Sequence, residues 1–133
     1  MKIVSGKIIE VNAKKMKDEP QKSVNINVNI ESAQKEGDKL QVVYSVTNTY
    51  EPDVATLKVT GELTIEIDKK QLDENLKTWS KEKTLEIEVM ELALNASTYA
   101  MSAVGTLLAY AIGVQAPINV PKAKLTKEPG KAA

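Results

Sequence analysis

Cysteine, histidine, arginine and phenylalanine are all absent from this 133-residue sequence. Without cysteine or histidine the chain has no thiol nucleophile, no disulfide, no imidazole general base and none of the usual zinc ligand sets. Its six glycines are scattered along the chain and form no phosphate-binding loop. We therefore predict that the protein is not an enzyme and that it uses neither a metal ion nor another cofactor.

The formal net charge is zero, because the chain contains 18 lysines and a total of 18 aspartates and glutamates. A chain with no net charge has no overall field to attract a polyanion. Proteins that bind nucleic acids commonly use arginine forks or stacked aromatic rings, whereas this chain has no arginine and only one Trp and four Tyr. We predict that nucleic acid is not a partner.

The length of 133 residues and the hydrophobic content of 42% suit one domain with its own core. We place this domain at residues 1–121. Residues 122–133 are basic and contain Pro and Gly, and we expect them to be disordered. The first ten residues include Gly6, Lys7 and Glu10, which is unlike a signal peptide, so a cytoplasmic location is expected.

Alternating apolar and polar residues predict four antiparallel strands in sequence order. The clearest runs are residues 24–30 and 40–50, which the turn at residues 35–38 joins into a hairpin. Residues 54–68 continue the alternation, with Gly61 on the apolar face, where it would admit a bulge or a close helix. Residues 3–16 form a further, less regular strand because Ile8 and Ile9 are adjacent.

The apolar period changes after Asp68, where Leu72, Leu76 and Trp79 have helical spacing. Acidic residues around this turn are interpreted as helix caps and solvated positions rather than as a cation site. A second helix, capped by Ser80, begins within residues 81–85 and ends at Ile112, with Gly113 as its C-terminal cap. It would contain about 30 residues, or about 45 Å of helix. The fold class is therefore α+β: a four-stranded antiparallel sheet, a short helix and one long helix.

The long helix carries no charged residue from Leu92 onward. It is long enough to cross a bilayer, but its Asn, Ser, Thr, Ala and Gly content and the glutamates at its N-terminal end favour burial in an oligomer over stable membrane insertion. One row of mostly small residues would let another helix or a sheet approach closely. This predicted oligomer interface consists of Ser97, Met101, Gly105, Ala109 and Gly113.

The order of the predicted elements resembles the SecB family of export chaperones. The residues that carry the resemblance are the hairpin at 24–50, the strand at 54–68, the helix around Ser97-Thr98-Tyr99-Ala100 and the segment Ala116-Pro117-Ile118-Asn119. The family has a Pro-Tyr-Ala run in that helix and an Ala-Pro-Ile-Asn-Phe stretch after it. The sequence lacks the family's acidic, Phe-containing motif near the N-terminus and its second helix after Pro121.

The resemblance implies a homotetramer, built as a dimer of dimers with long helices between two sheets, and apolar grooves that hold unfolded clients without a nucleotide. It extends client contacts to Pro117 and Ile118 in the matching segment. Val114 and Val120 are added because apolar side chains on an irregular segment can line a groove. Tyr50, Trp79 and Tyr110 lie near element ends and complete the candidate set, although such aromatic residues more often pack in cores or subunit interfaces, as we expect for Tyr44 and Tyr99.

These observations favour an ATP-independent chaperone, a holdase that binds unfolded or precursor polypeptides and is linked to protein export. A structural or adaptor oligomer dedicated to one protein partner is the alternative. A small-ligand binder with a pocket between sheet and helix has no support in the residue inventory.

Overall fold

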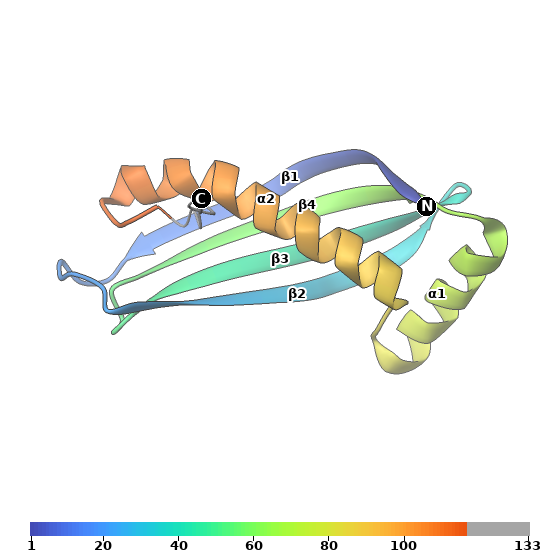
Figure 1. The fold of residues 1–133 in the computed structure, drawn as a ribbon, viewed down its shortest axis with the longest axis horizontal. Helices are drawn as coiled ribbons and strands as arrows, with labels where there is room; N and C mark the ends of the chain where they lie inside the picture. Colours follow the sequence, from blue (N-terminus) through green and yellow to red (C-terminus); the bar gives the residue numbers. More distant parts are fainter. Residues whose placement is uncertain (117–133) are drawn as a thin grey trace, which may run out of the picture.

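The computed structural model describes residues 1–116 and has a four-stranded antiparallel sheet followed by a short and a long helix (Figure 1). This arrangement confirms the predicted α+β fold class. The elements are β1 (Lys2–Lys15), β2 (Ser23–Glu36), β3 (Lys39–Glu51), β4 (Ala55–Glu66), α1 (Lys69–Glu82) and α2 (Ile87–Ile112).

The strands do not lie in sequence order across the sheet, which corrects the expectation from the sequence. The order is β1-β4-β3-β2, and β1 pairs with β4 rather than with β2. Residues 16–22 cross the ends of β4 and β3 to reach the other edge. On the way, the Met16 N–H donates to the Val54 carbonyl at 2.8 Å, and the Lys22 N–H donates to the Glu51 carbonyl at 2.8 Å. Both β1 and β2 are therefore edge strands.

The core lies between α2 and the face of the sheet that α2 covers, here called the inner face. Alternate residues of the two central strands point into this core, as the sequence pattern predicts. From 0% to 4% of their surface is exposed at Leu40, Val42, Tyr44, Val46, Tyr50, Ala55, Leu57, Val59, Leu63 and Ile65. Burial of each large aliphatic side chain stabilises the fold by about 1.5 to 3 kcal/mol.

The irregularity expected at Ile8 and Ile9 is a β-bulge in β1. Ile8 pairs with Gly61 and Glu10 pairs with Thr60, so Ile9 is an extra residue without a partner in β4. A second register shift separates Ile3 from Ser5. The bulge predicted near Gly61 is thus confirmed, but it lies in the strand that faces Gly61.

The helix boundaries differ from the prediction at the turn between α1 and α2. Asp68 caps α1 as expected, because its carboxylate accepts the Gln71 N–H at 2.8 Å. Ser80, however, lies inside α1 and caps nothing. Lys83 ends α1 in the left-handed conformation (φ 57°), with its N–H donating to the Trp79 carbonyl at 3.0 Å. As a result α2 starts only at Ile87 and has 26 residues, not about 30.

The buried side chain of Asn75 fixes this turn. Its Nδ2 donates to the Glu86 carboxylate at 2.7 Å and to the Gln71 carbonyl at 2.8 Å, while its Oδ1 accepts the Glu86 N–H at 2.9 Å. Three bonds from one amide satisfy most of its hydrogen-bonding capacity. Periodicity does not predict this contact, because it joins a residue of α1 to Glu86, the residue that precedes α2.

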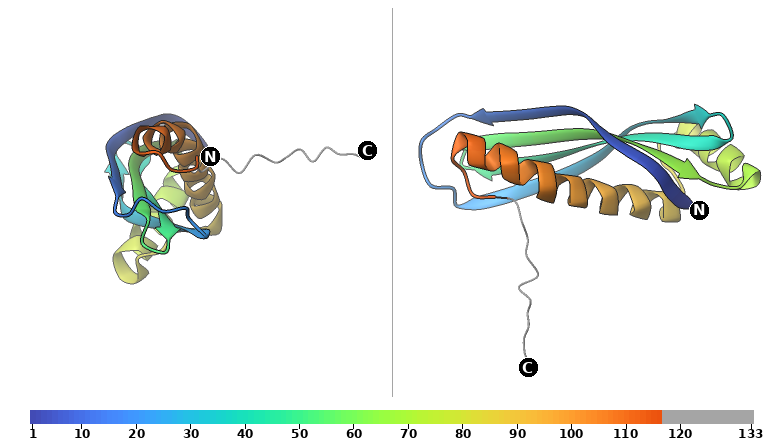
Figure 2. Two further views of the ribbon diagram at one scale, coloured as in Figure 1. Left: turned by 90° about the vertical axis from the view of Figure 1, so that its left-hand side faces the viewer. Right: turned by 90° about the horizontal axis from the view of Figure 1, so that it is seen from above.

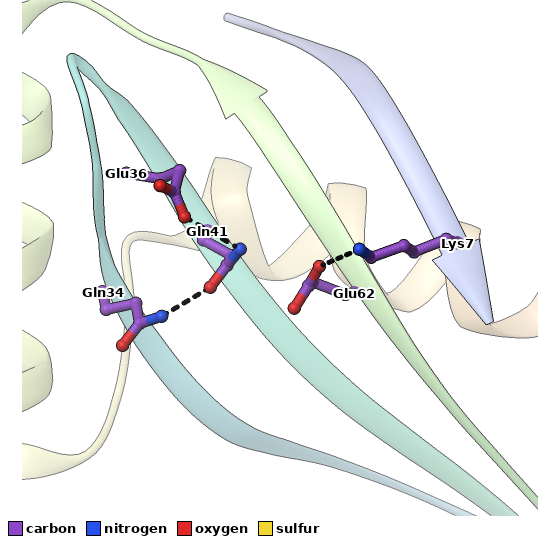
Figure 3. Close-up of polar contacts among 5 residues, drawn as sticks. All are labelled: Lys7, Gln34, Glu36, Gln41 and Glu62. Atoms are coloured by element: carbon purple, nitrogen blue, oxygen red, sulfur yellow. Dashed lines mark hydrogen bonds and ion pairs between the residues drawn. The ribbon is translucent and has the colours of Figure 1, made fainter. Parts of the chain in front are cut away.

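The opposite face of the sheet, here called the outer face, is polar. Lys7 of β1 lies 3.4 Å from the Glu62 carboxylate of β4, and the Gln41 Nε2 donates to Glu36 at 3.3 Å (Figure 3). Gln41 also accepts a hydrogen bond from Gln34 across β2 and β3. The outer face therefore shows the solvated pattern that the alternation predicts, and the apolar surface of interest lies on the inner face.

Candidate functional site

The long helix runs obliquely across the inner face and does not cover both edges of the sheet (Figures 1 and 2). Its N-terminal end lies toward β2 and its C-terminal end toward β1. Apolar side chains of the edge strands that point to the inner face are consequently left partly in solvent. Exposed fractions are 39% at Ile8 and 47% at Val11 in β1, and 37% at Val24 and 65% at Ile26 in β2.

The larger depression, here called the β1 groove, separates the first half of β1 from α2. Its cavity volume is about 660 Å³. The floor is made by Tyr44 and Leu63, and the walls by the apolar residues Ile3, Ile8, Leu92, Ala96, Ala100 and Val104. The four helix residues follow one another at i, i+4 spacing and form a continuous apolar wall.

A second depression, here called the β2 groove, lies between β2 and the first turns of α2 and has a volume of about 360 Å³. Val28 and Ile30 contribute from the strand, and Ile87, Met90 and Leu94 from the helix, with Lys83 and Glu91 at the polar margin. Ile87 is 76% exposed and Leu94 is 49% exposed. Both grooves are open to solvent and are large enough to accept apolar side chains.

The side of α2 that points away from the sheet is also apolar in part. Tyr99, Leu107 and Tyr110 are exposed there, by 78%, 71% and 89%. The solvent-facing side of a helix is usually polar, so three exposed large apolar residues on this side of α2 are unusual. The expectation that Tyr99 is packed is therefore not met within one chain, whereas Tyr44 is buried as expected.

The row proposed as an oligomer interface packs instead against the chain's own sheet. Ser97, Met101 and Ala109 are between 0% and 3% exposed, and Gly105 is buried as well. Small side chains allow α2 to lie close to the strands, which is the close approach that the row predicts, but the surface it meets is intramolecular. Gly113, the last member, is the C-terminal cap (φ 73°), as predicted.

Two of the predicted client contacts belong to the core. Tyr50 has no exposed surface, and its hydroxyl donates to the Gln115 carbonyl at 2.7 Å, so its assignment as a client contact is wrong for the single chain. Burial raises the pKa of this hydroxyl above the ordinary value. Val114 is half-buried against the core, and its N–H donates to the Ala109 carbonyl at 3.0 Å. Both residues hold the chain that leaves α2.

The remaining candidates are not gathered at one place. Trp79 is half-buried on α1, where the Lys83 Nζ lies 5.5 Å from its ring centroid, and Tyr110 is exposed near the end of α2. Pro117, Ile118 and Val120 lie outside the described residues, as does the predicted tail at 122–133. The structure therefore joins Tyr50 to Gln115, whereas Trp79 lies on the other helix and the Tyr110 side chain points into solvent.

Sequence reasoning missed Ile8, Ile87 and Leu94, which line the grooves, and the exposed Ile26 on the inner face of β2. Periodicity assigned Ile26 to a buried strand face, and the structure confirms its face but not its burial. The oblique path of α2 decides which part of that face is covered. Of the exposed apolar surface, only the part on α2 could be predicted from the sequence, because a helix without charge beyond Leu92 is too apolar to be fully solvated.

By length and composition alone, α2 could also cross a membrane. In this structure it packs along the sheet, with Val89, Ala93, Ser97, Met101, Gly105 and Ala109 buried. Among residues 1–116, no group of three or more acidic side chains is placed to hold a metal ion.

Comparison with known proteins shows a likeness among solved structures but not among sequences. No protein-family model matches the chain, and no curated protein matches its sequence. Among solved structures, a SecB-like chaperone from Mycobacterium tuberculosis, in complex with a ChAD peptide from an antitoxin, is similar at 12% sequence identity with a TM-score of 0.48. The match covers 90% of this chain and 88% of that one.

Proposed function

We propose that the protein is an ATP-independent holdase of the SecB-like type that binds non-native polypeptides in the cytoplasm. The carrying observation is the exposure of large apolar side chains along both edges of the inner face and on the free side of α2. We further propose that it catalyses no reaction and that its clients include precursors destined for export.

The physical argument is that this surface does not suit a protein without a partner. Monomeric soluble proteins rarely expose large contiguous apolar patches, and those that exist are often interaction sites. The grooves flanking α2 contain few charges, so they would accept apolar segments from many sequences and disfavour folded, charged surfaces. Met90 lines the β2 groove, and its flexible side chain can adapt to apolar residues of different shape.

The free side of α2 supports self-association as a second part of the proposal. Tyr99, Leu107 and Tyr110 would be covered if two copies packed through their long helices. The family resemblance implies a dimer of dimers, and we propose that arrangement. Light scattering of the purified chain should then give a mass of four subunits. A stable monomer at high concentration would contradict the proposed self-association.

The test of holding is the aggregation of a chemically unfolded reporter protein, followed by turbidity with and without the chain. We expect a delay that is independent of ATP and that weakens in Ile8→Ser and Ile87→Ser, one variant for each groove. Met16→Ser is the matched control, because Met16 is 42% exposed but lines neither groove.

No delay with any of several reporters would count against a general holdase. If the chain instead co-purifies with a single partner at fixed stoichiometry, the dedicated adaptor is the better description. Each variant should have the same far-ultraviolet circular dichroism spectrum and urea midpoint as the parent chain. A loss of holding in such a variant does not come from misfolding.

A further inference from the structure

The chain reverses direction where α2 ends. Gly113 has the left-handed conformation (φ 73°), and the Val114 N–H donates to the Ala109 carbonyl at 3.0 Å, which closes the last turn of the helix. Residues 114–116 therefore do not continue along the helix axis. They turn back alongside α2 toward the middle of the molecule (Figures 1 and 2).

Two hydrogen bonds fix the position of Gln115 on the inner face. The Tyr50 hydroxyl of β3 donates to the Gln115 carbonyl at 2.7 Å. Gln21, shortly before β2, donates from its Nε2 to the Gln115 side-chain oxygen at 3.1 Å. Because Tyr50 is the direct partner of Val24 on β2, these bonds bring the chain to the start of β2 just before residue 117.

The inner face of β2 is uncovered at this place. Val24 is 37% exposed and Ile26 is 65% exposed, because the C-terminal end of α2 lies toward β1 (Figure 1). These two residues are here called the β2 start patch. Neither lines the β2 groove, whose strand residues Val28 and Ile30 come next along the same face. The patch is therefore separate from the groove but in line with it.

The sequence that follows residue 116 fits this patch. It reads Pro-Ile-Asn-Val-Pro, so its apolar residues Ile118 and Val120 are two positions apart, and the two residues of the patch have the same spacing. Proline fixes its own φ and biases the residue before it toward extended backbone. In an extended chain, residues two apart point to the same side and lie about 6.6 Å from each other. Both apolar side chains can therefore reach the patch together.

We propose that residues 117–121 form an extended strap on the β2 start patch, with Ile118 over Val24 and Val120 over Ile26, and that a client has to displace this strap to extend beyond the β2 groove. The competition with clients rests on the proposed holding function, whereas the placement of the strap does not. Ile118 then takes the place of a client instead of binding one.

The short connection makes the chain's own segment the favoured occupant. Ile118 follows the fixed Gln115 closely, so the segment is present at the patch at a high effective concentration, ahead of any separate molecule. A client that competes with the strap binds with an affinity reduced by the fraction of chains in which the strap is released. Weakening the strap should therefore strengthen client binding.

Introduced cysteines test the placement, because the chain has none of its own. In the full chain carrying Ile26→Cys and Val120→Cys, we expect mild oxidation to form a disulfide within one chain, since the proposed contact brings the two β-carbons near disulfide distance. Ile8→Cys with Val120→Cys is the matched control, because Ile8 is 39% exposed on the inner face of β1, and it should stay reduced. Non-reducing electrophoresis separates the products. Equal crosslinking of both pairs overturns the placement.

Removal of the apolar side chains of the strap tests the competition. We expect Ile118→Ser combined with Val120→Ser to bind a fluorescein-labelled, permanently unfolded reporter about fivefold more tightly than the parent chain, as measured by anisotropy. Leu125→Ser is the matched control, an apolar residue beyond the strap, and should bind within about twofold of the parent. Weaker binding by the double variant overturns the competition, because the segment would then contact clients directly. Unchanged binding overturns it as well.

The two measurements can fail separately. If the cysteines at residues 26 and 120 join within one chain but neither the parent nor the double serine variant binds the reporter, the strap stands, whereas the holding function and the competition are wrong. If the parent binds the reporter but the cysteines do not join, the holding function stands and the strap is wrong. A disulfide that forms only between chains means that a second copy occupies the patch, which also overturns the proposal.

Discussion

The side chain of Tyr44 on β3 occupies the space above Gly61, its direct partner on β4. A methyl group at residue 61 would overlap the hydroxyl and ring carbons of Tyr44. The missing side chain on one strand thus allows the ring on the next strand to lie across Gly61, where it forms part of the floor of the β1 groove. The shape of this groove depends on that pair.

Gly61→Ala should destabilise the fold, because the new methyl group has to displace a buried ring. Overpacking of a core commonly costs about 1 to 3 kcal/mol, and a urea titration would measure the loss in the free energy of unfolding. The same substitution in a Tyr44→Leu background should cost less, since the ring is gone. Gly6→Ala is the control, because its methyl would meet the end of the Leu63 side chain at 3.3 Å and the Glu62 carbonyl oxygen at 3.9 Å, without overlapping either. Equal costs in both backgrounds would contradict the account.

Asn48→Leu should raise stability. Asn48 lies on the inner face of β3 with no exposed surface, and neither polar atom of its side chain makes a well-aligned hydrogen bond among the described residues, although the Tyr50 hydroxyl lies beside it. An unsatisfied buried amide costs about 1 to 3 kcal/mol, and a leucine of similar volume removes that cost. Differential scanning calorimetry should show a higher Tm. A lower Tm would contradict the prediction and indicate that the amide is satisfied by the neighbouring Tyr50 hydroxyl.

Asn75→Ala should weaken the junction between α1 and α2. The substitution removes three hydrogen bonds and leaves the Glu86 N–H without its acceptor, for an expected loss of about 2 to 3 kcal/mol in the free energy of unfolding. Thr78→Ala, which removes one hydrogen bond to the Glu74 carbonyl on the exposed side of α1, should change stability by about 0.5 kcal/mol or less. Similar effects from both variants would show that the Asn75 contacts do not fix the turn.

Tyr50→Phe should change how stability depends on alkaline pH. Burial raises the pKa of the Tyr50 hydroxyl above its ordinary value of 10.0, so the unfolded chain ionises first. The stabilisation is complete below about pH 10 and is lost as the pH rises through the pKa of the folded state. The phenylalanine variant lacks this loss but also lacks the bond to Gln115, about 1 kcal/mol at neutral pH. Urea midpoints from pH 8 to 11 would compare the two slopes, and parallel slopes would contradict the prediction.

Most of the fold could be predicted because its signals are local. The alternation at residues 24–30 and 40–50 places the hairpin, and Gly113 marks the end of the long helix, as the structure confirms. The position of β1 beside β4 could not be read from the sequence, because alternation states which face a residue occupies but not which strand lies next to it. The start of α2 was placed too early for a similar reason, since Asn75 and Lys83 determine it through tertiary contacts.

The candidate site was harder to predict than the fold. Exposed apolar residues such as Ile26 and Leu94 have the same pattern as core residues, and only the oblique path of α2 distinguishes them. Small residues from Ser97 to Ala109 indicated close packing correctly, but a single sequence cannot show whether the packed partner is the chain's own sheet or another copy.

The pairing of the first strand with the fourth has a consequence for synthesis on the ribosome. Lys2 is joined to Glu66, so the N-terminal segment emerges long before its neighbour exists. The local hairpin of β2 and β3 is able to form first, and β1 is added only after residue 66 has left the exit tunnel. During that interval the nascent chain exposes the apolar face of an incomplete sheet, which is the kind of surface that the proposed holdase would bind.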